Sequence, residues 1–232
     1  MDQPTSVGGY EILAELGRGT TGIVYKAQHQ IINPERPVAL KMPSLGSASE
    51  APQRLSWYHN EWNALRILTW EPDLAVPTLY DVGAGVPGQP NYYAREFVDG
   101  STLEELIATG ALALRAGIGI LSTIAGAVQR MHCLGIAHRN LRASNVLVRT
   151  DGTPKLIGYG HVWPLAGADR VPPGMSGVSA EVDVRALQEM LAWLCATSNQ
   201  PVPMPPEAIR QPGSVPSLGR FTEAVRCYLH AG

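Results

Sequence analysis

The chain has 232 residues, enough for one large domain or two small lobes with a sizeable core. Its formal net charge is −2, so no basic field favours nucleic acid or an anionic membrane as a partner. The sequence has no run of about 18 apolar residues and no secretory signal pattern at Met1. Its three cysteines are scattered without a metal-binding spacing, and these features together predict a cytoplasmic protein.

The N-terminal part of the chain has patterns typical of strands. Residues 1–9 are expected to be a disordered lead-in. Alternating apolar residues and a glycine-rich turn predict a hairpin over residues 10–27. Further strands are expected over residues 37–42, 76–82 and 91–98. Between them, apolar residues at spacings of three and four predict a helix from Leu55 to Leu68.

The rest of the chain has mostly helical patterns. Helices are expected over residues 102–108, 112–134, 183–195 and 218–229. Ser101 and Glu104 have the spacing of a capping box at the start of the first of them. A hairpin is expected to join a strand at 146–148 to another at 155–157. Strands with one inserted helix, followed mostly by helices, predict an α+β protein with a small β-rich lobe and a larger helical lobe.

Three glycines, Gly17, Gly19 and Gly22, lie on the predicted hairpin in a G-x-G-x-x-G pattern. Such glycines let backbone N–H groups approach a phosphate chain. The pattern turns from strand to strand, which argues against a dinucleotide-binding motif, because that motif turns from strand to helix. Taken alone, the pattern is better explained by a plain flexible hairpin.

Lys41 lies at the end of an apolar strand, and Glu61 lies at the edge of the apolar face of the helix that follows. As an ion pair, these two residues would aim the lysine at nucleotide phosphates. Each of them taken separately is more often a solvent-exposed charge.

A polar loop from His138 to Asn145 separates an apolar helix from an apolar strand. Its sequence, H-R-N-L-R-A-S-N, has the layout of the protein-kinase catalytic loop H-R-D-x-x-x-x-N. Because the glycine hairpin, strand lysine and helix glutamate precede it in the same order, the chain resembles the protein kinases, most of all the bacterial-type Ser/Thr kinases. The stretches that carry the resemblance are residues 17–24, 38–41, 93–100, 138–148 and 154–160.

The resemblance covers roughly residues 9–195 and implies a protein-kinase-like two-lobed fold with a five-stranded N-lobe that contains one helix. The implied domain spans residues 10–232, with an N-lobe at about 10–96, a hinge at about 96–100 and a truncated helical C-lobe at about 101–232. Only a proline-rich loop and one helix follow Cys195, so we expect the helical lobe to be shorter than is usual for the family.

The resemblance also implies roles for individual residues. Lys41 would pair with nucleotide phosphates, Glu61 would hold Lys41, and Asn145 would be a metal ligand. The residues placed at the nucleotide are Gly17, Gly19, Gly22, Val24, Ala39, Lys41, Glu61, Glu96, Val98, Asn145 and Leu147. Those given structural roles are His138, Arg139, Tyr159 and Asp183.

Two departures from the family pattern affect the residues that perform phosphoryl transfer. Asn140 stands where the catalytic aspartate is expected, and an amide is not a base. Gly158 stands where the aspartate of D-F-G would hold Mg²⁺, and it has no side chain. Asn145 would remain as a weak, neutral metal ligand, so we expect Mg²⁺ not to bind in the usual way.

The sequence therefore predicts a pseudokinase that acts as a binding or regulatory module, with ATP binding that is weak and independent of Mg²⁺. The partner is expected to be a protein, either another kinase or an effector, rather than nucleic acid or a membrane. The alternative is an active or atypical Ser/Thr kinase or nucleotidyl transferase with residual activity. Between Leu156 and Ala196 the sequence has no threonine and only the serines Ser176 and Ser179, so switching by phosphorylation in the usual manner is not expected.

Arg95 is the least expected residue, because it stands at the gatekeeper position, where the family usually has an apolar side chain. A buried guanidinium needs a partner. Our hypothesis is that Arg95 reaches Glu61 and competes with Lys41, which would tune or close the nucleotide site. The alternative is that the strand register is shifted by one and Arg95 points to solvent.

Overall fold

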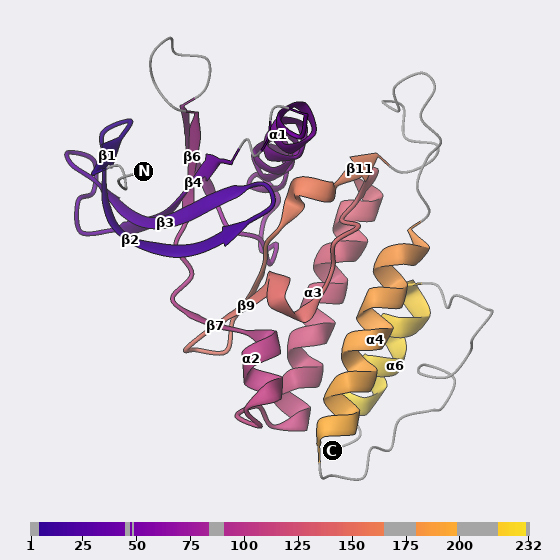
Figure 1. Cartoon of the computed structure of the whole chain (residues 1–232). Coiled ribbons are helices and arrows are strands. Elements are labelled where there is room, and N and C mark those ends of the chain that lie inside the picture. The colour runs from indigo at the N-terminus through magenta and orange to yellow at the C-terminus, as the bar shows by residue number, and fades with distance from the viewer. Residues whose placement is uncertain are drawn as a thin grey trace. The chain divides into compact units, whose positions relative to one another are not determined.

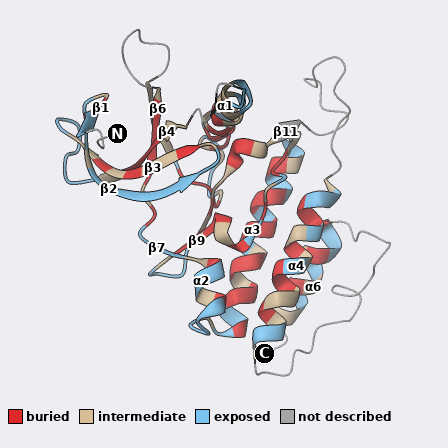
Figure 2. Ribbon diagram, in the orientation of Figure 1, coloured by how far each residue is buried: buried red, intermediate tan, exposed pale blue. Residues whose placement is uncertain are grey.

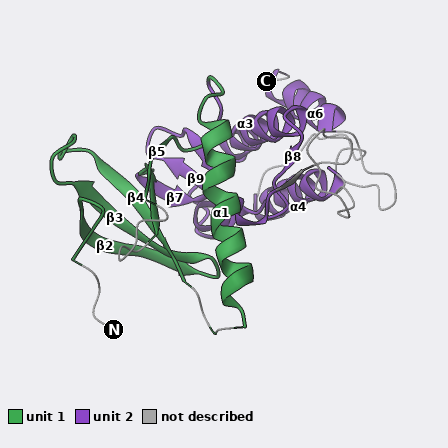
Figure 3. Ribbon diagram, turned by 90° about the horizontal axis from the view of Figure 1, so that it is seen from above, with its two compact units in different colours: residues 1–72, 76–98 green, residues 73–75, 99–232 purple. Residues whose placement is uncertain are grey.

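The structure is a computed structural model, and it describes residues 5–44, 47, 49–83, 91–164, 180–198 and 218–230 (Figure 1). The chain divides into two compact units (Figure 3). Unit 1 comprises residues 1–72 and 76–98, and unit 2 comprises residues 73–75 and 99–232. None of the helices in the described ranges is long and apolar enough to cross a bilayer.

Unit 1 is a curled six-stranded sheet with one helix. Its elements are β1 (Ser6–Val7), β2 (Tyr10–Gly19), β3 (Gly22–His29), β4 (Pro37–Pro43), α1 (Ala51–Leu68), β5 (Leu79–Gly83) and β6 (Tyr92–Glu96). The strand order is β1-β2-β3-β4-β6-β5, and every neighbouring pair is antiparallel. The N-terminal strands β1 to β4 thus form a meander, and β6 lies between β4 and the edge strand β5. Helix α1 lies between β4 and β5 in the chain.

The sheet has one strand more than the five expected. Ser6 and Val7 pair with Glu11 and Tyr10, so the prediction of a disordered lead-in over residues 1–9 is wrong at these two positions. The physical reason is that Val7 is buried against Tyr10 in the apolar core of the sheet, which stabilises the pairing.

The two faces of the sheet carry different side chains, because successive residues of a strand alternate. One face holds an apolar core made of Val7, Tyr10, Ala27, Val38, Leu40, Tyr92 and Ala94. The opposite face carries Ala39 and Lys41 on β4 and, paired with them, Arg95 and Tyr93 on β6. This second face, which we call the inner face, is the one that meets Glu61 of α1.

Unit 2 is mainly helical. Its elements are β7 (Gly100–Thr102), α2 (Leu103–Ala108), α3 (Leu114–Cys133), β8 (Ile136–Ala137), η1 (Ala143–Asn145), β9 (Val146–Arg149), β10 (Pro154–Leu156), η2 (Tyr159–His161), β11 (Trp163–Pro164), α4 (Glu181–Thr197) and α6 (Leu218–His230). Helix α3 packs against α4 and α6, and a buried stripe runs along it (Figure 2). A Cβ on Gly117 would lie 2.6 Å from the side chain of Leu194, so this interior glycine lets α3 and α4 approach closely.

Several boundaries of unit 2 differ from those expected. The capping box forms between Thr102 and Glu105, one residue after the predicted pair, because Thr102 is the residue with extended backbone at the start of α2. Gly100, which falls at the end of the segment expected to be a hinge, begins strand β7, which pairs with β9. Residues 165–179, which include Ser176 and Ser179, and residues 199–217, which include the expected proline-rich loop, lie outside the described residues.

Candidate functional site

The glycine-rich turn connects β2 and β3 at one end of the sheet, where Gly19 pairs with Gly22. A Cβ on Gly17 or Gly19 would meet nothing within 4 Å, so these two glycines leave the strand open to a ligand. Gly22 is different, because a Cβ there would lie 2.1 Å from the carbonyl oxygen of Met42. The turn therefore contains two glycines that leave space and one that the packing of β3 on β4 requires.

Gly22→Ala is expected to lower the free energy of unfolding by about 2 kcal/mol, because the new methyl overpacks against the β4 backbone. Chemical denaturation would measure this loss. Gly19→Ala is the matched control, since its methyl enters open space, and it should cost well under half as much. Equal losses in the two variants would contradict the assignment of Gly22 to strand packing.

Lys41 and Glu61 form a buried ion pair, as the sequence predicted. Lys41 also donates a hydrogen bond to the hydroxyl of Thr21, 2.6 Å away in the glycine-rich turn, a contact that the sequence analysis missed. Burial would raise the pKa of Glu61, but the charge and hydrogen bond of Lys41, with smaller effects of Tyr93 and Arg95, hold it below its ordinary value. The pair is therefore ionised, and Lys41 is oriented towards the turn.

Arg95 is buried on the inner face with only 7% of its surface exposed, so the alternative that it points to solvent is wrong. The predicted direct contact with Glu61 is also wrong, because Arg95 makes no ion pair among the described residues. Its Nη1 instead donates to the carbonyl oxygen of Glu96, 3.1 Å away. Lys41 on β4 forms the ion pair with Glu61, whereas Arg95 on β6 acts on Glu61 only through charge.

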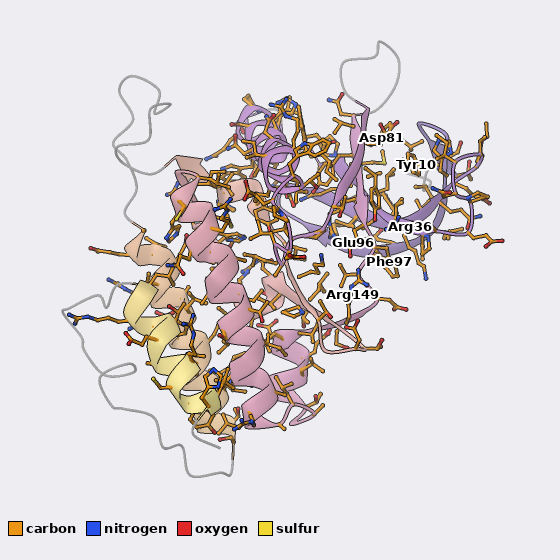
Figure 4. All side chains as sticks on the ribbon, turned by 180° about the vertical axis from the view of Figure 1, so that it is seen from behind. Tyr10, Arg36, Asp81, Glu96, Phe97 and Arg149 are labelled. Atoms are coloured by element: carbon orange, nitrogen blue, oxygen red, sulfur yellow. The ribbon has the colours of Figure 1, made fainter. Side chains whose placement is uncertain are left out.

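The end of β6 is held in place by backbone and side-chain hydrogen bonds. The Glu96 N–H donates to the Thr78 carbonyl at 2.8 Å, and the Thr78 N–H donates to the Glu96 carboxylate at 3.1 Å. Phe97 follows (Figure 4). The ammonium of Lys26 lies 4.7 Å from the centre of the Phe97 ring. Val98 is buried. The segment predicted to be a hinge thus begins from a fixed strand end.

A cavity of about 390 Å³ lies on the opposite face of the same sheet, and the sequence analysis did not anticipate it. Buried Tyr10 and Val38 contribute to its lining together with His29, Arg36 and Asp81 (Figure 4). Because Val38 alternates with Ala39 along β4, this cavity is separated from the inner face by the sheet itself.

In unit 2, the polar loop of the sequence analysis is held by one carboxylate. Asp183, fully buried in α4, accepts hydrogen bonds from the backbone N–H groups of His138 at 2.8 Å and Arg139 at 2.7 Å. His132 at the end of α3 adds a third contact at 2.9 Å, which the sequence analysis missed. Arg139 has a φ of 61°, a left-handed conformation that costs energy without such support.

The same carboxylate has a shifted pKa. Burial would raise the pKa of Asp183, but the hydrogen bonds from His132 and from the two backbone N–H groups lower it below its ordinary value. The ring of buried His138 accepts from the Asn140 N–H at Nδ1, so its Nε2 carries the hydrogen that faces the Ile157 carbonyl at 3.1 Å. The His138 ring also lies 5.0 Å from that of buried Tyr159. These contacts make the loop rigid from both ends.

Asn140 and Gly158, the two positions that depart from the kinase pattern, both contact Asn145 in unit 2. The side-chain nitrogen of Asn145 donates to the Asn140 carbonyl at 2.7 Å. Gly158, with a φ of 85°, passes so close to Asn145 that a Cβ on it would lie 2.8 Å from the asparagine amide. Any side chain at position 158 would therefore have to displace the amide of Asn145.

Comparison with known proteins agrees with this geometry. The model of the protein kinase domain family matches residues 10–173. The chain belongs to the protein kinase domain family. Its α+β fold, with a curled sheet in the N-terminal part and a helical C-terminal part, is the kinase-like fold that the sequence predicted.

Similar proteins include bacterial Ser/Thr kinases. PknL of Mycobacterium bovis, a serine/threonine-protein kinase, is 29% identical over 167 residues, which are 72% of this chain and 40% of that protein. PknB of Lactococcus lactis, a probable serine/threonine-protein kinase, is 35% identical over 153 residues, 65% of this chain and 23% of that protein. This kinase domain therefore spans less than half the length of these relatives.

The structure of this kinase domain brings together the predicted residues within each unit. In unit 1 it joins Lys41 to Glu61, and on the inner face Lys41 pairs in register with Val24 of β3. In unit 2 it joins Asp183 to the His138–Arg139 backbone. Leu147, which was predicted to lie at the nucleotide, is half-buried on β9.

The residues fit the phosphates of a nucleotide but do not fit the Mg²⁺ ion that usually accompanies them in a kinase. Around Lys41, the open glycines and the oriented ammonium fit nucleotide phosphates. Next to Asn145, Gly158 supplies no carboxylate, and its close approach to the asparagine amide leaves no room for one in the present arrangement. This arrangement does not fit Mg²⁺ held in the usual way.

Proposed function

We propose that this kinase domain is a pseudokinase, a binding and regulatory module with impaired phosphoryl transfer. The observation that carries the proposal is the packing of the Asn145 amide against Gly158, where a kinase would hold a metal between a carboxylate and an asparagine. Asn140 adds a second loss, because it offers no general base, and losing such a base typically costs about 10²–10⁴ in rate.

Nucleotide binding is proposed to persist, weakly and without dependence on Mg²⁺. It is supported by the Lys41–Glu61 pair, whose ammonium is available to phosphates, and by the open glycine positions. Without Mg²⁺ the charge on the β- and γ-phosphates is screened less, so the affinity is expected to be low.

A thermal-shift titration with ATP tests this proposal. We expect the melting temperature to rise by less than about 3 °C at millimolar ATP, and to rise equally with Mg²⁺ and with EDTA. A large rise that requires Mg²⁺ would show that the metal site is intact and would contradict the proposal.

The second candidate is a kinase or nucleotidyl transferase with residual activity, and the intact Lys41–Glu61 pair favours it. Transfer of radiolabel from ATP, compared with the variant Lys41→Ala, separates the two candidates. Turnover that disappears in Lys41→Ala would support the enzyme, whereas absence of turnover in both proteins supports the pseudokinase.

The partner is proposed to be a protein, such as another kinase or an effector. Large apolar side chains exposed on unit 1 support this proposal, with Ile31 84%, Ile32 65% and Trp70 82% exposed. A titration of a candidate kinase with this domain would test it, and an unchanged activity of that kinase together with no measurable binding would count against that partner.

A further inference from the structure

The inner face of the unit 1 sheet carries more positive than negative charge. Lys41 and Arg95 are both buried there, and Glu61 is the carboxylate that lies with them. Since Lys41 forms the ion pair with that carboxylate, Arg95 makes no ion pair among the described residues and interacts with Glu61 only through charge. A buried guanidinium with few hydrogen bonds is costly, so an acceptor group supplied by a ligand would stabilise it.

Arg95, rather than Lys41, is the residue whose donors have too few acceptors. A guanidinium has five N–H donors and no acceptor. In this structure, the hydrogen bond of Arg95 among the described residues is the one from Nη1 to the Glu96 carbonyl. The other donors of the guanidinium are not among the fully buried side-chain atoms that lack a partner, as the Tyr58 hydroxyl is, so they remain accessible.

The sheet register places these donors beside Ala39, one of the residues that the resemblance to kinases places at the nucleotide. Arg95 and Ala39 are directly opposed on β6 and β4, so their side chains stand next to each other on the inner face. Two residues along β4, Lys41 points to the phosphate end. A nucleotide with its phosphates at Lys41 and its base over Ala39 would therefore turn one edge of the base towards Arg95.

We infer that this site selects guanine nucleotides over adenine nucleotides through Arg95. Guanine presents two acceptors, O6 and N7, on one edge, which is the edge that an arginine binds with two parallel hydrogen bonds. Adenine presents N7 beside an amino group, which would place donors of the base against donors of Arg95. This inference rests on the proposed nucleotide binding and names the base that the site prefers.

The test is a set of binding titrations by calorimetry with GTP, ITP and ATP in buffer with EDTA. We expect GTP to bind at least about tenfold more tightly than ATP, because a bidentate contact to the base commonly discriminates by more than this. ITP keeps O6 and N7 but lacks the 2-amino group, so it should retain most of the advantage of GTP. Equal or tighter binding of ATP would overturn the inference while leaving the proposed nucleotide binding in place.

The variant Arg95→Met tests whether the preference for GTP over ATP comes from the Arg95 side chain. It keeps an unbranched chain and removes every donor, so the GTP advantage should disappear while ATP binding stays equal or improves. Arg95→Lys keeps the charge but cannot make the bidentate contact, and it should also lose most of the preference. Arg36→Met, on the opposite face of the sheet, should leave the GTP to ATP ratio unchanged. A preference that survives in both Arg95 variants would overturn the assignment, and no binding of any nucleotide to the unmodified chain would overturn the proposed nucleotide binding itself.

Discussion

Replacing Asp183 with asparagine is expected to lower the free energy of unfolding by about 3 kcal/mol, the scale for removing one partner of a buried charged network. The carboxylate accepts two backbone hydrogen bonds and one from His132, all within 2.9 Å. An asparagine would turn an amide N–H towards at least one of these donors. The left-handed residue Arg139 would lose its support at the same time.

The loss should also depend on pH. The pKa of Asp183 is lowered in the folded protein, so the folded state binds fewer protons than the unfolded chain. Its contribution is therefore fully present above the ordinary carboxyl pKa, near 4, and is lost as the pH falls through the lower folded value. Urea denaturation between about pH 3 and pH 7 should show a shallower acid decline in Asp183→Asn than in the unmodified chain.

Glu189→Gln is the matched control, because it removes one negative charge from an exposed position of the same helix. It should change stability by less than about 0.5 kcal/mol and leave the acid decline intact. A stability of Asp183→Asn equal to that of the control would show that the carboxylate does not hold the loop.

The elements that the sequence predicted well are those with strong periodicity. The apolar stripe of α3 is the buried face of that helix, and the short apolar run of β4 is a strand buried on both faces, so in both elements the pattern of apolar residues predicts the structure. The Lys41–Glu61 pair was predictable because the order of motifs resembles that of kinases, although each residue separately was ambiguous. The short strands β1 and β7 were not predicted, since two or three residues carry no periodicity and form only through their partners.

The details of the site depended on contacts between residues far apart in the sequence. His132 reaches Asp183 over an interval of 51 residues, and no local pattern marks that contact. The direction of Arg95 was decided by the carbonyl of its own neighbour, Glu96, rather than by the carboxylate that charge alone suggested. Side-chain rotamers, which a sequence pattern does not specify, decided both outcomes.

Gly158→Asp is expected to have two opposite effects. Without ligand, it should lower the free energy of unfolding by about 2 kcal/mol, because a Cβ in the left-handed region is strained and the Asn145 amide must leave the Asn140 carbonyl. With ATP, it should create a stabilisation that requires Mg²⁺, since a carboxylate beside Asn145 supplies the oxygen ligand that the unmodified chain lacks. We expect this gain to be about 1 kcal/mol, or about 3 °C in Tm.

Gly158→Ala separates the steric effect from the chemical one. Its methyl meets the same Asn145 amide at 2.8 Å, so it should show the loss of stability without the gain from Mg²⁺ and ATP. Phosphoryl transfer should stay undetectable in Gly158→Asp, because Asn140 still offers no base, and should require Asn140→Asp in the same chain. If the unmodified chain and Gly158→Asp respond equally to Mg²⁺, then position 158 does not control the metal, and the proposed impairment would rest on Asn140 rather than on Gly158.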